Sequence, residues 1–136
     1  MPTINKIKIF TDGGARGNPG PAAIGIVIKD DNDQILKTYS EYLGETTNNQ
    51  AEYKALIKGL ELAKEFKPKQ VICYLDSELV VKQMNQEYKV KDKDLQLLFV
   101  KAWNMAVSFK KVEYHHIRRN LNKEADRLLN QELDKH

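Results

Sequence analysis

Residues 8–20 read KIFTDGGARGNPG, and this stretch decides what the rest of the chain has to build. Apolar and polar side chains alternate from Ile7 to Asp12, which is the period-2 pattern of a β-strand. Glycines and prolines crowd the positions that follow, and they predict a sharp turn whose backbone can approach a ligand closely. We therefore expect Asp12 to stand at the carboxyl end of the first strand. The alternative is a turn that merely contains an aspartate, because Asp is a common turn residue.

Length and composition predict an ordinary globular protein. The chain has 136 residues, which suits a single domain over 1–136, and its net charge of +3 is too small to establish nucleic-acid binding by itself. No apolar run approaches the roughly 20 residues that span a bilayer, and no secretory signal is recognisable. The lone cysteine, Cys73, lies in an apolar run, which predicts a buried thiol and excludes an internal disulfide and a cysteine-based zinc site. We expect a cytoplasmic protein.

The remaining patterns predict the element order βββαβααβα. Further strands are predicted at 22–29, 34–43, 71–75 and 112–116, and helices at about 46–66, 78–85, 92–107 and 123–134. Helical crossovers between the first, fourth and fifth strands predict an α/β fold whose mixed sheet has two antiparallel and three parallel strands. In the helix at 92–107, the spacing of the apolar residues Leu95, Phe99, Trp103 and Val107 predicts that all four pack in the core.

Four carboxylates occupy comparable positions in this scheme. Asp12 and Asp76 each follow an apolar strand, and ligand sites in such sheets collect at the carboxyl ends of parallel strands. Glu52 falls on the core-facing stripe of its helix, where an isolated charge is costly to bury. A structural alternative is that its place in the first turn favours a negative charge. Asp126 lies at the edge of the inward face of the last helix. We predict that all four converge.

Converging carboxylates need positive charge. Two ionised carboxylates about 4 Å apart repel by about 4 kcal/mol at an effective dielectric constant of 20. Four therefore require protonation or multivalent cations. Oxygen ligands without cysteine favour Mg²⁺ or Mn²⁺ over zinc. A pair of such ions can activate a water and stabilise the leaving oxygen in phosphodiester cleavage.

Four motifs resemble, in the right order and over nearly the whole chain, those of type 1 ribonuclease H: TDGGARGNPGPAAIG, TTNNQAEYKAL, YLDSELVVKQM and HIRRNLNKEADRL. The resemblance implies a ribonuclease H-like α/β fold, a five-stranded mixed sheet of strand order 3-2-1-4-5 flanked by helices. It implies hydrolysis of the RNA strand of RNA/DNA hybrids with two Mg²⁺ ions, or with Mn²⁺, leaving 5′-phosphate and 3′-hydroxyl ends. The catalytic metal ligands would be Asp12, which bridges both ions, Glu52 and Asp76 at one ion, and Asp126 at the other.

The resemblance also implies residues that bind the hybrid. A-form-like duplexes are read across the minor groove through 2′-hydroxyls and phosphates, which asparagine and threonine side chains suit. The residues concerned are Asn18, Thr47, Asn48, Asn49 and Gln50. For those at 47–49, helix capping is an alternative role that can coexist with binding.

The sequence departs from the family pattern at several positions. Gln50 stands where the family often has Arg, and Tyr88–Lys91 is a stub in place of a longer basic protrusion, so the chain resembles the short archaeal and bacterial members. His116 lies ten residues before Asp126, which matches a histidine that assists proton transfer or product release, but glycines do not flank it. A helper role and a strand-end role both stay open. Arg118 is either a phosphate contact or part of a solvated basic turn.

Two other functions are compatible with the sequence. One is a catalytically silent module that binds hybrids or double-stranded RNA, and the retention of all four acids argues against it. The other is a different nuclease of the same fold, against which the glycine loop and the Asn48-Asn49 pair argue. We expect a monomer that acts on RNA/DNA hybrids, with double-stranded RNA as a further substrate class.

Overall fold

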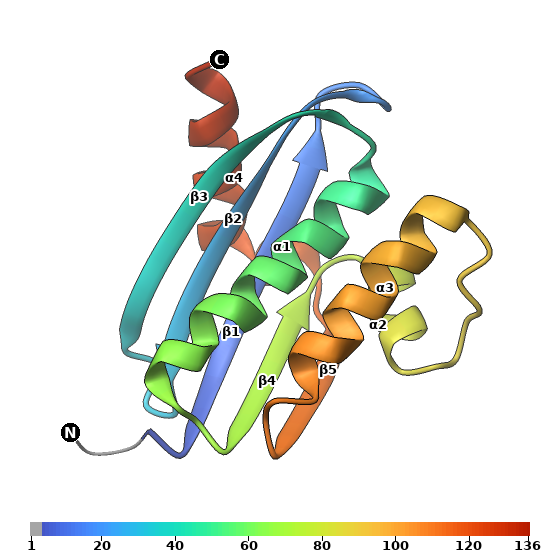
Figure 1. The fold of residues 1–136 in the computed structure, drawn as a ribbon. Helices are drawn as coiled ribbons and strands as arrows, with labels where there is room; N and C mark the ends of the chain where they lie inside the picture. The colour runs from blue at the N-terminus through green and yellow to red at the C-terminus, as the bar shows by residue number, and fades with distance from the viewer. Residues whose placement is uncertain (1–3) are drawn as a thin grey trace.

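A computed structural model describes residues 4–136, and its elements follow the predicted order. Most element boundaries lie within a few residues of the predicted ones (Figure 1). The strands are β1 (Lys6–Ala15), β2 (Gly20–Asp30), β3 (Ile35–Thr46), β4 (Gln70–Leu75) and β5 (Lys111–His116). The helices are α1 (Asn48–Ala63), α2 (Glu78–Met84), α3 (Lys93–Ala106) and α4 (Lys123–Asp134), with short 3₁₀ turns η1 (Lys64–Phe66) and η2 (Arg119–Leu121). No helix in this described part is long and apolar enough to cross a membrane.

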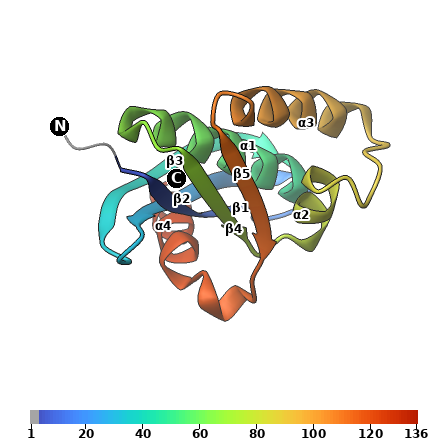
Figure 2. The ribbon, with the colours of Figure 1, turned by 90° about the horizontal axis from the view of Figure 1, so that it is seen from below.

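The five strands form one mixed sheet in the order β3-β2-β1-β4-β5, as predicted. β1 pairs antiparallel with β2, and β2 with β3, whereas β4 runs parallel to both β1 and β5. Helices cover the sheet from both sides: α1 and α3 lie on one face and α4 on the other (Figure 2). Because β1 and β4 are parallel, their carboxyl ends point toward the same edge of the sheet, between these two helical layers.

The main core lies between the sheet and α1. Ile7 and Ile9 of β1 are fully buried there, as the alternating pattern predicts, and Cys73 of β4 is buried beside them. Gly59 of α1 makes this packing close, because a Cβ on it would lie 2.9 Å from Cγ2 of Ile9. The helix is thereby held against the strand that carries Asp12.

The predicted end of the first strand is wrong. β1 continues past Asp12 through Gly13 and Gly14 to Ala15, and Asp12 pairs with Gly25 inside the β1–β2 ladder. The first glycines serve close packing instead of a turn, since a Cβ on Gly13 would collide with the carbonyl group of Ala51 in α1. The reversal comes later, around Gly17, whose φ of +111° is one that glycine adopts readily.

The predicted core face of α3 is also partly wrong. Leu95 is buried, but Trp103 is 39% exposed and Val107 is 68% exposed. The reason is geometric: each step of four residues overshoots a helical turn by about 40°, so a series with this spacing drifts around the helix. Ala102 and the partly buried Met105 occupy the face that packs on the core.

Candidate active site

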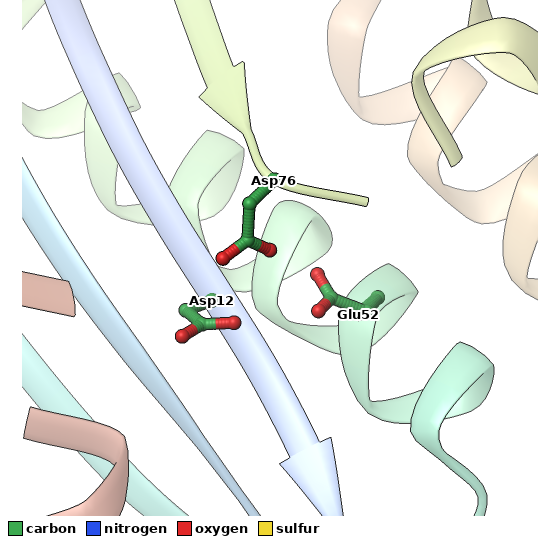
Figure 3. Close-up of side chains that lie close together, drawn as sticks. All are labelled: Asp12, Glu52 and Asp76. Atoms are coloured by element: carbon green, nitrogen blue, oxygen red, sulfur yellow. The ribbon is translucent and has the colours of Figure 1, made fainter. Parts of the chain in front are cut away.

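The site lies at the point where β4 ends while its neighbour β1 continues for several more residues. The last pair in the parallel ladder is Thr11 with Leu75, and Asp12 and Asp76 are the next residues along the two strands. The two carboxylates therefore lie side by side in the space left by the end of β4. Glu52 reaches the same space from α1, and the three side chains point toward one another (Figure 3).

Gly13 brings Glu52 within reach of Asp12. A Cβ at Gly13 would clash with the backbone of Ala51 and lie 2.6 Å from the backbone nitrogen of Glu52, so the first turn of α1 rests directly on β1. Thr47 fixes the start of that turn, because its Oγ1 accepts a hydrogen bond of 3.2 Å from the backbone N–H of Gln50. Thr47 thus caps α1, as one of its two predicted roles requires.

On the opposite face of the sheet, Gly25 allows α4 to lie equally close to its strand. A Cβ at Gly25 would collide with the carbonyl oxygen of Ala125, so the first turn of α4 lies close against β2 beside Asp12. This contact brings Asp126 into the cleft that holds the other carboxylates. Its Oδ1 lies 3.8 Å from Nη2 of Arg119.

The carboxylates of Asp12, Glu52 and Asp76 form a compact group in which Asp12 and Glu52 are buried and Asp76 is half-buried. Each offers an oxygen within 4.8 Å of the others, and Asp12 and Glu52 are only 4% and 9% exposed. Burial raises the pKa of Asp12 to about 8, and the charges of Asp76 and Asp126 add to the effect. Burial, reinforced by the charge of Asp12, raises the pKa of Glu52 well above its usual range. The group is therefore unstable as three bare anions.

The donor set fits a hard divalent cation. Oε2 of Glu52 is buried and has no hydrogen-bond partner among residues 4–136, so it requires a proton or a cation. All three ligands are carboxylate oxygens, the type that Mg²⁺, Mn²⁺ and Ca²⁺ prefer. Burial also raises the pKa of Asp76, but a hydrogen bond from Asn122 and the charge of Arg119 oppose that shift. Asp12, Glu52 and Asp76 thus make an acidic metal-binding triad.

A cleft of about 490 Å³ extends from the triad along β1 to the second half of α4. It contains all four predicted carboxylates and one of the predicted nucleic-acid-binding residues. Its lining consists of Asp12, Gly13, Gly14, Ala15, Arg16, Asn48, Glu52, Asp76, Arg119, Asp126, Leu129, Asn130 and Leu133.

Asn18 and Asn48 join the glycine loop to the start of α1. Oδ1 of Asn48 accepts from the backbone N–H of Ala15 at 2.8 Å, and Oδ1 of Asn18 accepts from the backbone N–H of Asn48 at 3.0 Å. Both amide oxygens are therefore engaged within the protein. The two NH₂ groups remain available as donors, and Asn48 itself lines the cleft.

The other predicted residues do not line the cleft. Gln50 accepts a hydrogen bond of 2.6 Å from Oγ1 of Thr46, and Asn49 is exposed on the first turn of α1. His116 is exposed at the end of β5, where it pairs with Leu75 in the ladder, and Arg118 is exposed just before η2.

Sequence reasoning gave little weight to two residues near the triad. Arg119 follows Arg118 directly in a basic stretch of the sequence, and only the fold distinguishes them, because Arg119 lines the cleft and Arg118 does not. Asn122 is buried behind Asp76. Its place just before the last helix is the only sequence signal, and that signal predicts a helix cap.

The chain is similar to known proteins over most of its length. The family described as reverse transcriptase-like matches residues 10–131. Ribonuclease HI of Halobacterium salinarum is 38% identical over 129 residues, which cover 95% of this chain and 65% of that protein. The bifunctional protein Rv2228c of Mycobacterium tuberculosis is 42% identical over 130 residues, which cover 95% of this chain and 36% of that protein. The chain thus spans about a third to two-thirds of the length of these relatives.

Solved structures are similar over nearly their whole length. The crystal structure of LC11-RNase H1 in complex with an RNA/DNA hybrid superposes with a TM-score of 0.91 at 46% identity, covering 95% of this chain and 97% of that one. RNase H1 from Halobacterium salinarum superposes with a TM-score of 0.94 at 37% identity, covering 97% of this chain and 100% of that one.

Proposed function

Because this chain belongs to the type 1 ribonucleases H, we propose that it is an endoribonuclease that hydrolyses the RNA strand of RNA/DNA hybrids. The products would carry 5′-phosphate and 3′-hydroxyl ends. The observation that carries this proposal is the buried triad, whose three oxygens lie within 4.8 Å of one another at the floor of an open cleft. The similarity to a protein solved with an RNA/DNA hybrid supports the choice of substrate.

Two Mg²⁺ ions are the proposed cofactors, with Mn²⁺ as a substitute. Asp12 would be shared between both ions, Glu52 and Asp76 would complete one site, and Asp126 would help to hold the other. When bound, such ions activate a water and stabilise the leaving oxygen of a phosphodiester. The contribution of the chain is to keep the carboxylates converged in a buried setting, where burial and mutual repulsion disfavour their charged forms.

Asn18 and Asn48 would recognise the hybrid through their NH₂ groups. Their oxygens already accept hydrogen bonds from the backbone, so the side chains present donors only. The minor groove offers matching acceptors, namely base-edge atoms and 2′-hydroxyl oxygens. Asn49, on the same end of α1, would make contacts of the same kind. Thr47 would lie near a phosphate of the DNA strand, and Gln50 stands at a further phosphate-contact position.

Arginines at the other side of the cleft would contact phosphates. Arg119 lines the cleft, is highly exposed in its side chain and is tied only loosely to Asp126. Arg118 would contact the duplex outside the cleft. For His116 the proposal is a helper role in proton transfer or product release, exercised from the end of β5.

A substrate panel tests the proposal. Labelled RNA/DNA hybrid, double-stranded RNA and DNA duplex are incubated with the protein in Mg²⁺, in Mn²⁺ or with a chelator. We expect cleavage of the RNA strand of the hybrid that requires a divalent ion and is abolished by Asp12→Asn. The matched control is Asp94→Asn, an exposed aspartate on α3, which should cleave like the wild type.

Two results would count against the proposal. Hybrid binding in Mg²⁺ without cleavage would favour a silent binding module. Full turnover by Asp12→Asn would refute the assignment of the site.

A further inference from the structure

Asn122 is a buried polar residue to which the proposed chemistry assigns no role. It is 1% exposed and stands immediately before α4. Asparagine is among the preferred residues at this position, because its side-chain oxygen can accept from a backbone N–H in the first helical turn. The Asn122 side chain makes no such cap. Helix capping therefore does not explain how this side chain is oriented.

The side chain bonds to β1 instead. Nδ2 of Asn122 donates a buried hydrogen bond of 2.9 Å to the carbonyl oxygen of Thr11. This carbonyl belongs to the peptide unit that joins Thr11 to Asp12, and Thr11 is the last residue of β1 that pairs with β4. The bond thus holds the backbone of Asp12 at the point where the support of β4 ends.

Asn122 is also linked to two of the three other carboxylates, Asp126 and Asp76. Its backbone carbonyl accepts a 3.0 Å hydrogen bond from the backbone N–H of Asp126, the first turn of α4. Its polar side chain also holds down the pKa of the Asp76 carboxyl group, against the effect of burial. Oδ1 of Asn122 remains buried without a partner in the described part of the chain. A residue serving helix stability alone would gain more by turning this oxygen toward α4.

We propose that Asn122 is a positioning residue that acts through Asp12, Asp76 and Asp126, holding carboxylates from three separate elements in one arrangement. It does not itself line the cleft, so it acts only through residues that do. The expected effect on kcat rests on the proposed function. The Mg²⁺ affinity and the hydrogen bond to Thr11 can be measured without any cleavage.

Asn122→Ser is the informative variant. Serine is as good a helix cap as asparagine, but its short side chain does not reach Thr11. A capping role predicts that serine preserves every property. The positioning role predicts a folded protein in which kcat on the hybrid falls roughly 10- to 100-fold, as for other residues that orient metal ligands, with KM nearly unchanged. Asn120→Ser, two residues earlier and exposed, is the matched control and should behave like the wild type.

Mg²⁺ affinity gives a readout without substrate. Calorimetric titration of the metal-free proteins with Mg²⁺ alone should show clearly weaker binding for Asn122→Ser and unchanged binding for Asn120→Ser. Thermal unfolding of the same samples shows whether the variant is folded. Wild-type Mg²⁺ affinity and kcat in Asn122→Ser would overturn the proposal.

A measurement on the wild-type chain covers the case in which the variants do not fold. In isotope-labelled protein, the side-chain NH₂ of Asn122 should exchange slowly with solvent and show a coupling through the hydrogen bond to the Thr11 carbonyl. Fast exchange without that coupling would overturn the proposal. Failure of the wild type to cleave hybrids would reject the proposed function, whereas a normal wild type with an unaffected Asn122→Ser would reject only the positioning role.

Discussion

Asp12 and Gly25 face each other in the β1–β2 ladder, and the missing side chain of one determines what surrounds the other. Because Gly25 has no Cβ, the carbonyl of Ala125 sits directly over the sheet, and the next residue of α4 is Asp126. The same relationship holds on the other face, where Gly13 admits the turn of α1 that carries Glu52. The absence of a side chain at Gly13 and at Gly25 therefore lets the helices on both faces of the sheet bring their carboxylates to one site.

Gly25→Ala should displace α4 and impair the site. The added methyl group would overlap the Ala125 carbonyl, which is backbone and cannot rotate away. Overpacking of this kind costs about 1–3 kcal/mol, which urea unfolding would detect. Gly14→Ala is the control, because its Cβ would lie 3.3 Å from the flexible end of Leu129. Equal stability of the Gly25 variant and the wild type would contradict the close-packing argument.

Stability of the metal-free protein should fall as the pH rises. Burial raises the pKa of Asp12 from 3.8 to about 8, so the folded state keeps a proton that the unfolded state releases. The stabilisation is complete below the unfolded pKa and is lost as the pH rises through the folded pKa. Urea unfolding between pH 4 and 8 with chelator present would show the decline, and Mg²⁺ should restore stability by binding the folded state.

Asp12→Asn provides the matched test of that decline. The amide does not titrate, so the dependence of the free energy of unfolding on pH should become shallower, leaving the contribution of Glu52. Asp94→Asn should keep the full dependence. A pH profile of Asp12→Asn identical to that of the wild type would mean that Asp12 titrates normally.

Asn48→Asp should separate recognition from folding. The carboxylate keeps an oxygen for the backbone N–H of Ala15 but has no NH₂ group to offer the hybrid. We expect a stable protein whose KM for the hybrid rises roughly tenfold, equivalent to about 1.4 kcal/mol. Steady-state kinetics and thermal unfolding on the same preparation measure both effects. If KM stays unchanged while stability falls, Asn48 serves the scaffold alone.

Arg119→Ala should weaken hybrid binding in a salt-dependent manner. Loss of one phosphate contact reduces the slope of log K against log salt by about 1. Filter binding with inactive Asp12→Asn as the background gives this slope without cleavage. Arg127→Ala, an exposed arginine on α4, is the control. An unchanged slope for the Arg119 variant would mean that Arg119 contacts no phosphate and only offsets the charge of Asp126.

Much of the fold was predictable because the strands carry clear signals. The apolar run that ends before Asp76 and the alternation through Ile9 indicated two neighbouring parallel strands, and the structure confirms this pairing, although β1 continues past Asp12. The position of Glu52 on a buried helical face was likewise readable from its spacing. These features depend on periodicity along one element, which a sequence displays directly.

Features that depend on contacts between elements were not predictable. The glycines after Asp12 looked like a turn, because glycine has the same sequence appearance whether it bends the chain or admits a neighbouring helix. Trp103 was expected to be buried because it lies four residues after Phe99, but residues spaced by four turn gradually away from the core face of α3. Asn122 received no role from its sequence context, because nothing in the sequence reveals that its amide reaches Thr11.

The two-sided assembly of the cleft has a consequence during synthesis. α4 is the last of the described elements to leave the ribosome, and it carries Asp126. A nascent chain that has already folded β1–β3 and α1 would hold Asp12 and Glu52 together but lack this carboxylate. On the proposed assignment, the set of four carboxylates would therefore be complete only after α4 has been synthesised and has packed against β2.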